Sequence, residues 1–362
     1  MADKPLRVLI AGGGTGGHII PALAIARELV AQYAANVRFL GTARGLEKRL
    51  VPAAGFSLDL VQVGPLNSVS LATRLRTVAG LPMGVLTCIR LLQKFRPHVV
   101  LGVGGYASGP GMLAAILTGT PRVAFEPNAV PGMANRWIGR RVQAAAVNFA
   151  ATARYFRNAT VTGIPVRPEF FLLAPRTPNA TPHLLVFGGS QGARVLNATV
   201  PQIATPLLAA VPGLTILHQC GARHFAATRE AYALGGAPAD RWEVREFMDD
   251  MPQRVGAASL VLCRSGASTV AELAAAAKPA LLVPFPQAAD DHQRHNAETL
   301  VEAGAAELLL QADLTPEKLL NQLQSLLENP ERLAAMSSHA RTLAHPDAAL
   351  QIAQILKKLQ PA

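Results

Sequence analysis

LRVLIAGGGTGGHIIPALAIARELV, from Leu6 to Val30, and HLLVFGGSQGARVLNATV, from His183 to Val200, decide the fold of this chain. Each stretch runs from an apolar strand through glycines into a helix. Glycines at such a junction let backbone N–H groups approach a ligand, and the helix start behind them carries partial positive charge. Both turns are therefore predicted to bind anions. Because the unit occurs twice, we expect an α/β protein of two Rossmann-like domains that face each other across a cleft holding a phosphorylated ligand.

Length and composition agree with that organisation. A chain of 362 residues suits two domains of about 150 to 180 residues each. Half of the residues are hydrophobic and only 5% are aromatic, which favours strands alternating with alanine-rich helices over an all-β design. Three scattered cysteines predict neither a disulfide framework nor a thiolate metal site. Since the N-terminus enters a strand directly, we expect no secretory leader and a cytoplasmic protein.

Apolar runs mark the expected strands of each domain. They lie at 6–11, 37–40, 99–103, 122–125 and 144–147 in the first half, and at 184–187, 214–218, 242–245, 260–263 and 280–283 in the second. GIPVRP at 163–168, followed by the proline-rich residues 174–182, predicts the connection between the domains. We therefore expect domains at 1–165 and 166–345, with an amphipathic helix within 346–362 that packs back on the first domain.

Positive charge is concentrated in the first half of the chain. The net charge is +11; residues 1–165 hold 18 Lys and Arg against 5 Asp and Glu, whereas residues 166–362 hold 16 against 18. Such a field attracts polyanions, and because neither a nucleic-acid motif nor many aromatic side chains accompany it, an anionic membrane surface is favoured over nucleic acid. Between Leu71 and Leu92, a helical apolar stripe with interspersed arginines is interrupted by Pro82 and Gly84. It predicts a kinked helix pair packed on the sheet or, alternatively, a surface resting on lipid headgroups.

The first glycine turn, GGGTGGH at 12–18, satisfies the GxGxxG spacing, which alone is a weak dinucleotide signal. A dinucleotide site also needs an acidic residue after the second strand, but that strand ends Phe39-Leu40-Gly41-Thr42. Hydride transfer is therefore disfavoured. His18 stands at the helix start, where the dipole should disfavour the imidazolium and leave a neutral base. The alternative is a histidine that only caps or packs.

The remaining motifs follow other strands. GGSQG at 188–192 suits a nucleotide diphosphate or a tight structural turn. In RSGASTVAE at 264–272, Glu272 either completes a capping box with Thr269 or grips ribose hydroxyls. DDHQRHN at 290–296 favours amides that recognise a sugar over a metal site, because its i,i+3 histidines lack a third spaced ligand. GGYASGP at 104–110 and FEPN at 125–128 lie at the sheet edge where open α/β sheets bind ligands, or form ordinary turns.

Taken together, the motifs resemble a known family across nearly the whole chain. GGGTGGH, LGTARGLE, GGYASGP, EPN, GIPVRPE, GGSQGARVLN, EFMDDM, CRSGASTVAE and DHQRHNAETL, in this order, are similar to the bacterial glycosyltransferases that complete the lipid-linked peptidoglycan precursor. The resemblance implies a GT-B fold, with a polyprenyl-pyrophosphoryl-muramyl-pentapeptide on the first domain and UDP-GlcNAc mainly on the second. It also implies peripheral attachment to the cytoplasmic face of the cell membrane. The chain departs from the family pattern at Pro127, where glutamine is usual, at Ile164, where asparagine is common, and in loop 64–67, which lacks the expected basic residues.

The resemblance also assigns residues to the substrates. Ser190 and its turn would hold the diphosphate, Phe247 and the backbone of Met248 the uracil, and Glu272 the ribose. The other implied substrate-binding residues are Thr15, Gly16, Gly17, Tyr106, Asn128, Arg167, Ala267, Ser268, Thr269, Val270, Ala271, His292 and Gln293.

The expected chemistry is direct inverting transfer of N-acetylglucosamine to the 4-hydroxyl of the muramyl sugar. His18 is the first candidate for the general base and Glu126 the second. The turn at 188–192 and Arg167 would stabilise the negative charge that develops on the leaving UDP. We therefore expect that no cofactor or metal is obligatory, and the sequence has no persuasive DxD motif. The alternatives are another UDP-sugar enzyme such as an epimerase, a nicotinamide oxidoreductase, and a non-catalytic membrane-docking protein.

Overall fold

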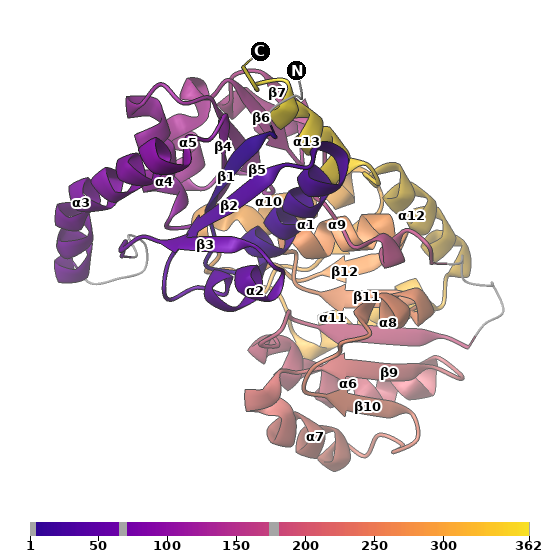
Figure 1. Ribbon diagram of the computed structural model, residues 1–362. Coiled ribbons are helices and arrows are strands. Elements are labelled where there is room, and N and C mark those ends of the chain that lie inside the picture. The colour runs from indigo at the N-terminus through magenta and orange to yellow at the C-terminus, as the bar shows by residue number, and fades with distance from the viewer. Residues whose placement is uncertain (1–4, 65–70, 174–180, 362) are drawn as a thin grey trace. The chain divides into compact units, whose positions relative to one another are not determined.

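A computed structural model describes residues 5–64, 71–173 and 181–361, with side chains from residue 80 onward in the helix that starts at 71. The chain divides into two compact units (Figure 1), which we call the first unit, Met1–Pro165 with Asp347–Ala362, and the second unit, Val166–Pro346. Each unit is built on one parallel sheet flanked by helices. The predicted class, α/β with two Rossmann-like domains, is confirmed.

The sheet of the first unit has seven strands in the order β3-β2-β1-β4-β5-β6-β7. Their bounds are β1 Arg7–Gly12, β2 Asn36–Gly41, β3 Ser57–Leu60, β4 Val99–Gly104, β5 Arg122–Glu126, β6 Ala144–Val147 and β7 Ala159–Val161. The order reverses between β1 and β4, which are neighbours paired in parallel from Val8 with Val99. Ligands of open α/β sheets bind at such a switch point, beyond the carboxyl ends of the strands.

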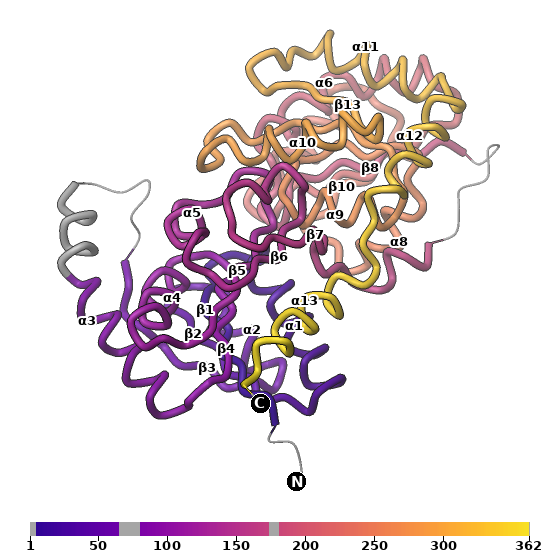
Figure 2. The backbone as a smooth tube through the Cα atoms, turned by 90° about the horizontal axis from the view of Figure 1, so that it is seen from above, coloured from indigo at the N-terminus to yellow at the C-terminus, as the bar shows by residue number. Residues whose placement is uncertain are grey.

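Helices cover both faces of this sheet. The α-helices are α1 Gly16–Tyr33, α2 Glu47–Ala53, α3 Leu71–Phe95, α4 Ser108–Leu117, α5 Met133–Ile138 and α13 Ala348–Lys357. Two short 3-10 helices belong to this unit, η1 Gly139–Arg141 and η2 Ala150–Tyr155, and a third, η3 Pro168–Phe170, belongs to the second unit. The C-terminal helix α13 packs against α1 (Figure 2), and the Lys357 ammonium lies 5.8 Å from the centre of the Tyr33 ring.

Helix α3 corrects one prediction. It is a single helix of 25 residues with Pro82 inside it, and not a pair of helices. A proline removes one backbone hydrogen bond from a helix interior. The helix continues through Pro82 because Val85, Cys88 and Leu92 beyond it are buried in one apolar cluster with the sheet.

The second unit repeats the topology with six parallel strands in the order β10-β9-β8-β11-β12-β13. The strands are β8 His183–Phe187, β9 Thr215–Gln219, β10 Trp242–Arg245, β11 Leu260–Cys263, β12 Ala280–Leu282 and β13 Ala306–Leu308. The helices are α6 Arg194–Ala210, α7 Phe225–Leu234, α8 Met251–Ala257, α9 Ala267–Ala275, α10 His292–Glu302, α11 Pro316–Leu327 and α12 Pro330–Thr342, with 3-10 turns η4 Ala222–His224 and η5 Ala289–Asp291. Its switch point lies between β8 and β11.

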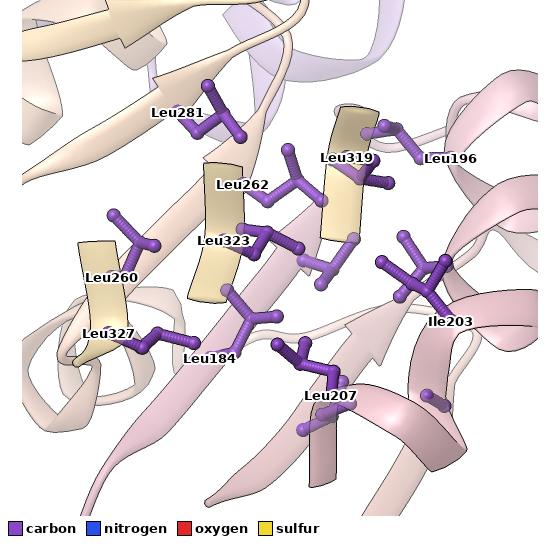
Figure 3. Close-up of a cluster of buried hydrophobic side chains, with 14 of the residues drawn as sticks. Leu184, Leu196, Ile203, Leu207, Leu260, Leu262, Leu281, Leu319, Leu323 and Leu327 are labelled. Atoms are coloured by element: carbon purple, nitrogen blue, oxygen red, sulfur yellow. The ribbon is translucent and has the colours of Figure 1, made fainter. Parts of the chain in front are cut away.

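Leucine side chains fill the core between this sheet and its helices. Figure 3 shows Leu184 of β8 and Leu262 of β11 against Leu196 and Leu207 of α6 and Leu323 of α11. All are fully buried. Such a core fixes β8 and β11 side by side, so that the turns following these strands start from defined positions.

Two further findings concern the whole chain. Cys88, Cys220 and Cys263 are free, buried thiols. Within the described ranges, every helix is too short or too polar to cross a bilayer.

Candidate active site

The first glycine turn is closed by a carboxylate of the protein itself. Glu47, only 1% exposed, accepts hydrogen bonds from the Gly14 N–H at 2.7 Å and from the N–H and hydroxyl of Thr42, both at 2.9 Å. Burial acts to raise the pKa of Glu47, but these hydrogen bonds outweigh it and hold the pKa below its usual value. The Gly13 N–H donates to the Gly104 carbonyl at 3.2 Å.

In this arrangement the N–H groups of Gly13 and Gly14 are bonded within the protein, so the predicted anion site of the first turn depends on the residues after Gly14. A Cβ atom at Gly13 or at Gly45 would lie within about 2.5 Å of the Glu47 carboxyl group. The glycines therefore make room for an internal anion. The donors left for a ligand lie later, at the start of α1, where Thr15 and Gly17 are exposed and Gly16 is half-buried.

His18 lies in the first turn of α1 and is half-buried. Its ring is next to Gly104 at the end of β4: a Cβ atom there would lie 2.9 Å from the imidazole Cε1. Gly104 also has φ +88°, which other residues rarely adopt. Tyr106, two residues further, is 46% exposed. His18 and the exposed Tyr106 therefore both belong to segments that follow the switch-point strands β1 and β4.

Glu126, the second candidate base, is the last residue of β5 and is enclosed by hydrogen-bond donors of the protein. It is 2% exposed, and its carboxylate accepts hydrogen bonds from the side chain and backbone of Asn128 at 3.1 and 3.0 Å, from the Gly132 N–H at 3.2 Å and from Asn135 at 2.9 Å. Burial raises its pKa, against these bonds. These donors come from the loop after β5 and from Asn135 of α5, so that Glu126 holds the EPN segment and Asn128 in place.

The second glycine turn is open. Gly189, Ser190 and Gln191 are exposed, and the turn is closed by the Gly192 N–H donating to the Gly189 carbonyl at 3.0 Å. Gly189 has φ +86° and nothing within 4 Å of the position of a Cβ atom. Exposed backbone donors and a hydroxyl in such a turn suit an anionic ligand, as predicted for the diphosphate.

The segment predicted to hold uracil follows β10. Phe247 is 54% exposed, whereas Met248 is 3% exposed. The Met248 N–H donates to the Gln219 side chain at 2.8 Å. The Met248 N–H is therefore already bonded within the protein. Of the two backbone groups predicted to contact uracil, only the Met248 carbonyl is left for that contact.

Helix α9 begins after β11 and carries Glu272. The capping-box interpretation is wrong, because Gly266 is the N-cap and Thr269 lies inside the helix. Burial raises the pKa of Glu272 to about 7, and the positive charge of Arg167 opposes the shift. Arg167 is exposed, with its guanidinium 5.1 Å from the centre of the Phe170 ring. The other predicted residues of this helix start are buried at Ala267 and Val270 and half-buried at Ser268, Thr269 and Ala271.

Helix α10 packs beside α9 and brings Gln293 to it. The Ser265 hydroxyl donates to the Gln293 carbonyl at 2.8 Å, and the Gln293 side-chain oxygen accepts from the Phe285 N–H at 3.0 Å. This leaves the Gln293 amide nitrogen as the donor for a ligand. The His292 ring bonds the Ala289 carbonyl at 2.7 Å.

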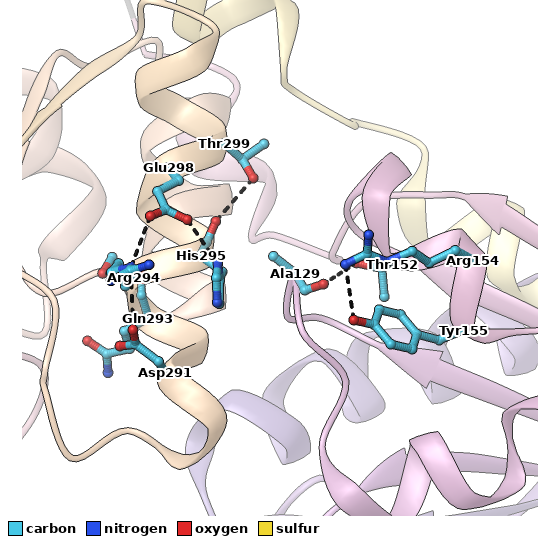
Figure 4. A network of polar contacts seen from close by, with 11 residues as sticks. Ala129, Thr152, Arg154, Tyr155, Asp291, Gln293, Arg294, His295, Glu298 and Thr299 are labelled. Carbon is cyan, nitrogen blue, oxygen red and sulfur yellow. Dashed lines mark hydrogen bonds and ion pairs between the residues drawn. The ribbon is translucent and has the colours of Figure 1, made fainter.

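The acidic residues around α10 pair with cations of the same helix. Arg294 bridges Asp291 at 3.4 Å and Glu298 at 3.0 Å, and His295 lies 2.9 Å from Glu298 (Figure 4). Among the residues that the structure describes, no cluster of three or more His, Cys, Asp or Glu is placed to hold a metal ion.

Sequence reasoning missed two residues that shape the turns, Glu47 and Gln219. The glycines at 13, 41 and 45 were a signal for Glu47, since each would place a Cβ atom against its side chain. Of the three departures from the family pattern, Pro127 and Ile164 are buried, while residues 65–67 of the 64–67 loop lie outside the described ranges.

Comparisons with known proteins agree along the whole chain. Residues 8–147 match the glycosyltransferase family 28 N-terminal domain, and residues 183–352 match the family 28 C-terminal domain. A protein of Anaeromyxobacter sp. (strain K) is 44% identical over 98% of this chain and 93% of its own length, and one of Solibacter usitatus is 44% identical over 97% and 95%. Both are named UDP-N-acetylglucosamine–N-acetylmuramyl-(pentapeptide) pyrophosphoryl-undecaprenol N-acetylglucosamine transferase.

A solved structure gives the same result. The crystal structure of Acinetobacter baumannii MurG superposes with a TM-score of 0.82 at 34% identity, covering 98% of this chain and all of that one. Two glycine turns at two switch points, the motifs that follow the strands, and relatives of this identity over nearly the full length point the same way. The chain belongs to glycosyltransferase family 28 and, within it, to the UDP-N-acetylglucosamine–N-acetylmuramyl-(pentapeptide) pyrophosphoryl-undecaprenol N-acetylglucosamine transferases.

Proposed function

We propose that this protein transfers N-acetylglucosamine from UDP-GlcNAc to the 4-hydroxyl of the muramyl sugar of undecaprenyl-pyrophosphoryl-MurNAc-pentapeptide, with inversion at the anomeric carbon. The observation that carries the proposal is the open turn at 188–192, which lies at the switch point of the second unit beside the strand end that leads to Glu272. The relatives that match over nearly the full length carry this activity in their name.

The second unit binds the donor in this proposal. Backbone N–H groups and the Ser190 hydroxyl bind the diphosphate, and the exposed Phe247 ring packs on the uracil. Glu272 accepts hydrogen bonds from the ribose hydroxyls. The Gln293 amide donates to a hydroxyl of the sugar.

The first unit presents the acceptor and the base. His18 removes the proton of the muramyl 4-hydroxyl as its oxygen bonds to the anomeric carbon, while the bond from that carbon to the phosphate oxygen breaks and UDP leaves. The turn at 188–192 and Arg167 stabilise the charge that develops on the diphosphate. Thr15, Gly17 and Tyr106, which are exposed around His18, contact the substrates.

The reaction needs no metal in this proposal. The carboxylates of Asp291, just before α10, and of Glu298 within it are paired with Arg294. Backbone donors and Arg167 supply the positive potential at the diphosphate instead. Turnover should survive EDTA, and a complete loss that Mg²⁺ reverses would contradict this assignment.

Peripheral attachment to the cytoplasmic face of the membrane completes the proposal. Met83 and Leu86 of α3 are 64% and 47% exposed, and Leu117 at the end of the adjacent α4 is 63% exposed. Apolar side chains on a unit with an excess of Lys and Arg suit an anionic lipid surface. Met83→Ser with Leu86→Ser should weaken sedimentation with phosphatidylglycerol vesicles and leave UDP binding unchanged. Equal sedimentation of both proteins would remove this surface from the proposal.

The transfer itself is tested by following radiolabelled sugar from UDP-GlcNAc into the extracted lipid acceptor, with other UDP-hexoses as competitors. We expect label in the lipid, strict dependence on the acceptor and release of one UDP per sugar transferred. Conversion of UDP-GlcNAc to another UDP-sugar without acceptor would show an epimerase instead. Vesicle binding without UDP release would show a docking protein.

A further inference from the structure

Gln219 lies at the centre of the donor-binding edge of the second unit. It is the last residue of β9, the strand between β8 and β10. In the sheet register it is opposite Phe187, which precedes the open glycine turn, and opposite Arg245, which precedes the segment with Phe247. One side chain at this position can therefore reach the loops that follow both neighbouring strands.

The Gln219 side chain bonds both loops at once. Its amide nitrogen donates to the Gly189 carbonyl at 3.0 Å, and its oxygen accepts from the Met248 N–H at 2.8 Å. Gln219 is 1% exposed and Met248 is 3% exposed. A buried amide that satisfies a donor in one loop and an acceptor in the other fixes the distance between them, because breaking either bond leaves a buried polar group without its partner.

The backbone beyond Gln219 tightens the same link. The N–H groups of Cys220 and Gly221 donate to the carbonyls of Arg245 and Glu246 at 3.0 and 3.2 Å. On the other side, a Cβ atom at Gly192 would collide with the Cys220 carbonyl, so that the glycine turn packs directly on this backbone. The end of β9 is thus held between the glycine turn at 188–192 and the segment at 245–248, which is predicted to bind uracil.

We propose that Gln219 is a positioning residue that couples the diphosphate turn to the uracil-binding segment, so that the two parts of the nucleotide bind as one unit. The inference rests on the proposed function of the second unit. Gln219 itself touches neither part of the nucleotide. It sets the spacing of the two loops. That spacing determines how much more tightly UDP binds than uridine, because the diphosphate and the uracil must reach their loops at the same time.

The test compares the dissociation constants of UDP and of uridine by calorimetry in wild type, Gln219→Met and Gln219→Glu. Methionine matches glutamine in length and makes neither hydrogen bond, whereas glutamate keeps an acceptor for the Met248 N–H and loses the donor to Gly189. We expect the affinity ratio of UDP to uridine to fall about tenfold in both variants, the cost of a net hydrogen bond. Uridine alone should bind the glutamate variant within about twofold of wild type.

Steady-state kinetics separates positioning from catalysis. For both variants, KM for UDP-GlcNAc should rise about tenfold while kcat changes less than about threefold, since the reacting atoms are untouched. Gln202→Met is the matched control: its exposed side chain bonds only its own helix, at the Ala198 carbonyl, and its affinity ratio should equal that of wild type.

The outcomes distinguish failure of the proposed function of the second unit from failure of the coupling by Gln219. If wild type does not bind UDP, the proposed function of the second unit fails. If wild type binds UDP and the folded variants keep the wild-type affinity ratio, only the coupling fails. Should the variants not fold, amide hydrogen exchange of wild type still decides: we expect the Met248 N–H to be protected without nucleotide, and exchange at the rate of an exposed amide would overturn the proposal.

Discussion

Three glutamates of this protein show how the surroundings of a residue decide its task. Glu47 and Glu126 are buried and surrounded by donors from their own loops. Glu272 is half-buried with the charge of Arg167 acting on it, and its pKa is raised to about 7. A carboxylate whose oxygens accept hydrogen bonds from its own loop holds that loop in place. A carboxylate whose pKa is raised toward neutrality is a candidate for binding a ligand.

Removal of the proposed base has a defined signature. His18→Ala should lower kcat by about 10²- to 10⁴-fold, the usual contribution of a positioned general base, with little change in UDP affinity, because the donor binds to the other unit. Free imidazole should restore part of the rate. The measurement is steady-state transfer to the lipid acceptor, together with calorimetry for UDP, and an unchanged kcat would remove His18 from the role.

Glu272 predicts a pH dependence of nucleotide binding. Only its ionised form accepts the ribose hydroxyls fully, so uridine affinity should rise with pH through about 7 and increase about tenfold from pH 6 to pH 8. Uridine is the probe because its lack of phosphates removes their titration from the data. Glu272→Gln should bind uridine more weakly and equally at both pH values. A flat wild-type profile would contradict the assignment.

The same raised pKa has the opposite effect on the stability of the ligand-free second unit. The folded state holds a proton on Glu272 that the unfolded state releases above the ordinary carboxyl pKa of 4.5. Stability from this group is therefore present at low pH and is lost as the pH rises to about 7. Urea unfolding at several pH values should show this slope in wild type and not in Glu272→Gln.

At the scale of elements, local sequence predicted the strands that carry apolar runs and missed three short strands. The predicted strands at 242–245 and 260–263 coincide with β10 and β11. The strands β3, β7 and β13 were missed because they are edge strands of three or four residues with at most one buried side chain, so that their sequence carries little apolar signal. Ser190 and the turn around it could be placed from sequence, since strand, glycines and helix are contiguous.

The residues that could not be placed act across the sheet. Gln219 lies 30 residues from Gly189 and 29 from Met248, and these become neighbours only through strand pairing. Glu47 reaches Gly14 over 33 residues. No periodicity or spacing along the chain reports such contacts, because they depend on which strands are adjacent.

Glu47 also predicts how the first glycine turn responds to mutation. Glu47→Gln replaces an acceptor with an amide that cannot satisfy all three donors of Gly14 and Thr42, and should destabilise the first unit by about 1–3 kcal/mol at neutral pH. Since the folded pKa of Glu47 is lowered, its contribution is present above 4.5 and fades as the pH falls below that value, so the deficit should shrink in acid.

Hydrogen exchange across residues 12–18 and urea unfolding measure this effect. Glu28→Gln removes the same charge at a half-buried position of α1, where the carboxylate accepts from Gln32 of the same helix, and is the control. Equal exchange in the two variants would show that Glu47 does not hold the turn.

At the scale of the whole molecule, the two units can be followed separately, because the two tryptophans, Trp137 and Trp242, lie one in each. Trp242 stacks on Tyr232, with ring centres 5.0 Å apart, and reports on the second unit. In a Trp137→Phe background, UDP at about 100 times its Kd should raise the unfolding free energy reported by Trp242 by about 2.7 kcal/mol. In a Trp242→Phe background we expect a smaller shift. A shift seen by Trp137 alone would place the nucleotide on the wrong unit.

The position of α13 has a consequence for how the protein is made. The helix belongs to the first unit but follows the whole of the second unit along the chain. Domains generally fold as units during synthesis, starting from the N-terminus. Here α1 leaves the ribosome long before its partner, so the α1 surface that α13 covers stays bare until residues 348–357 have been synthesised. A ribosome-stalled chain that ends before Asp347 should therefore carry a finished second unit and a first unit that is still open to chaperones and proteases.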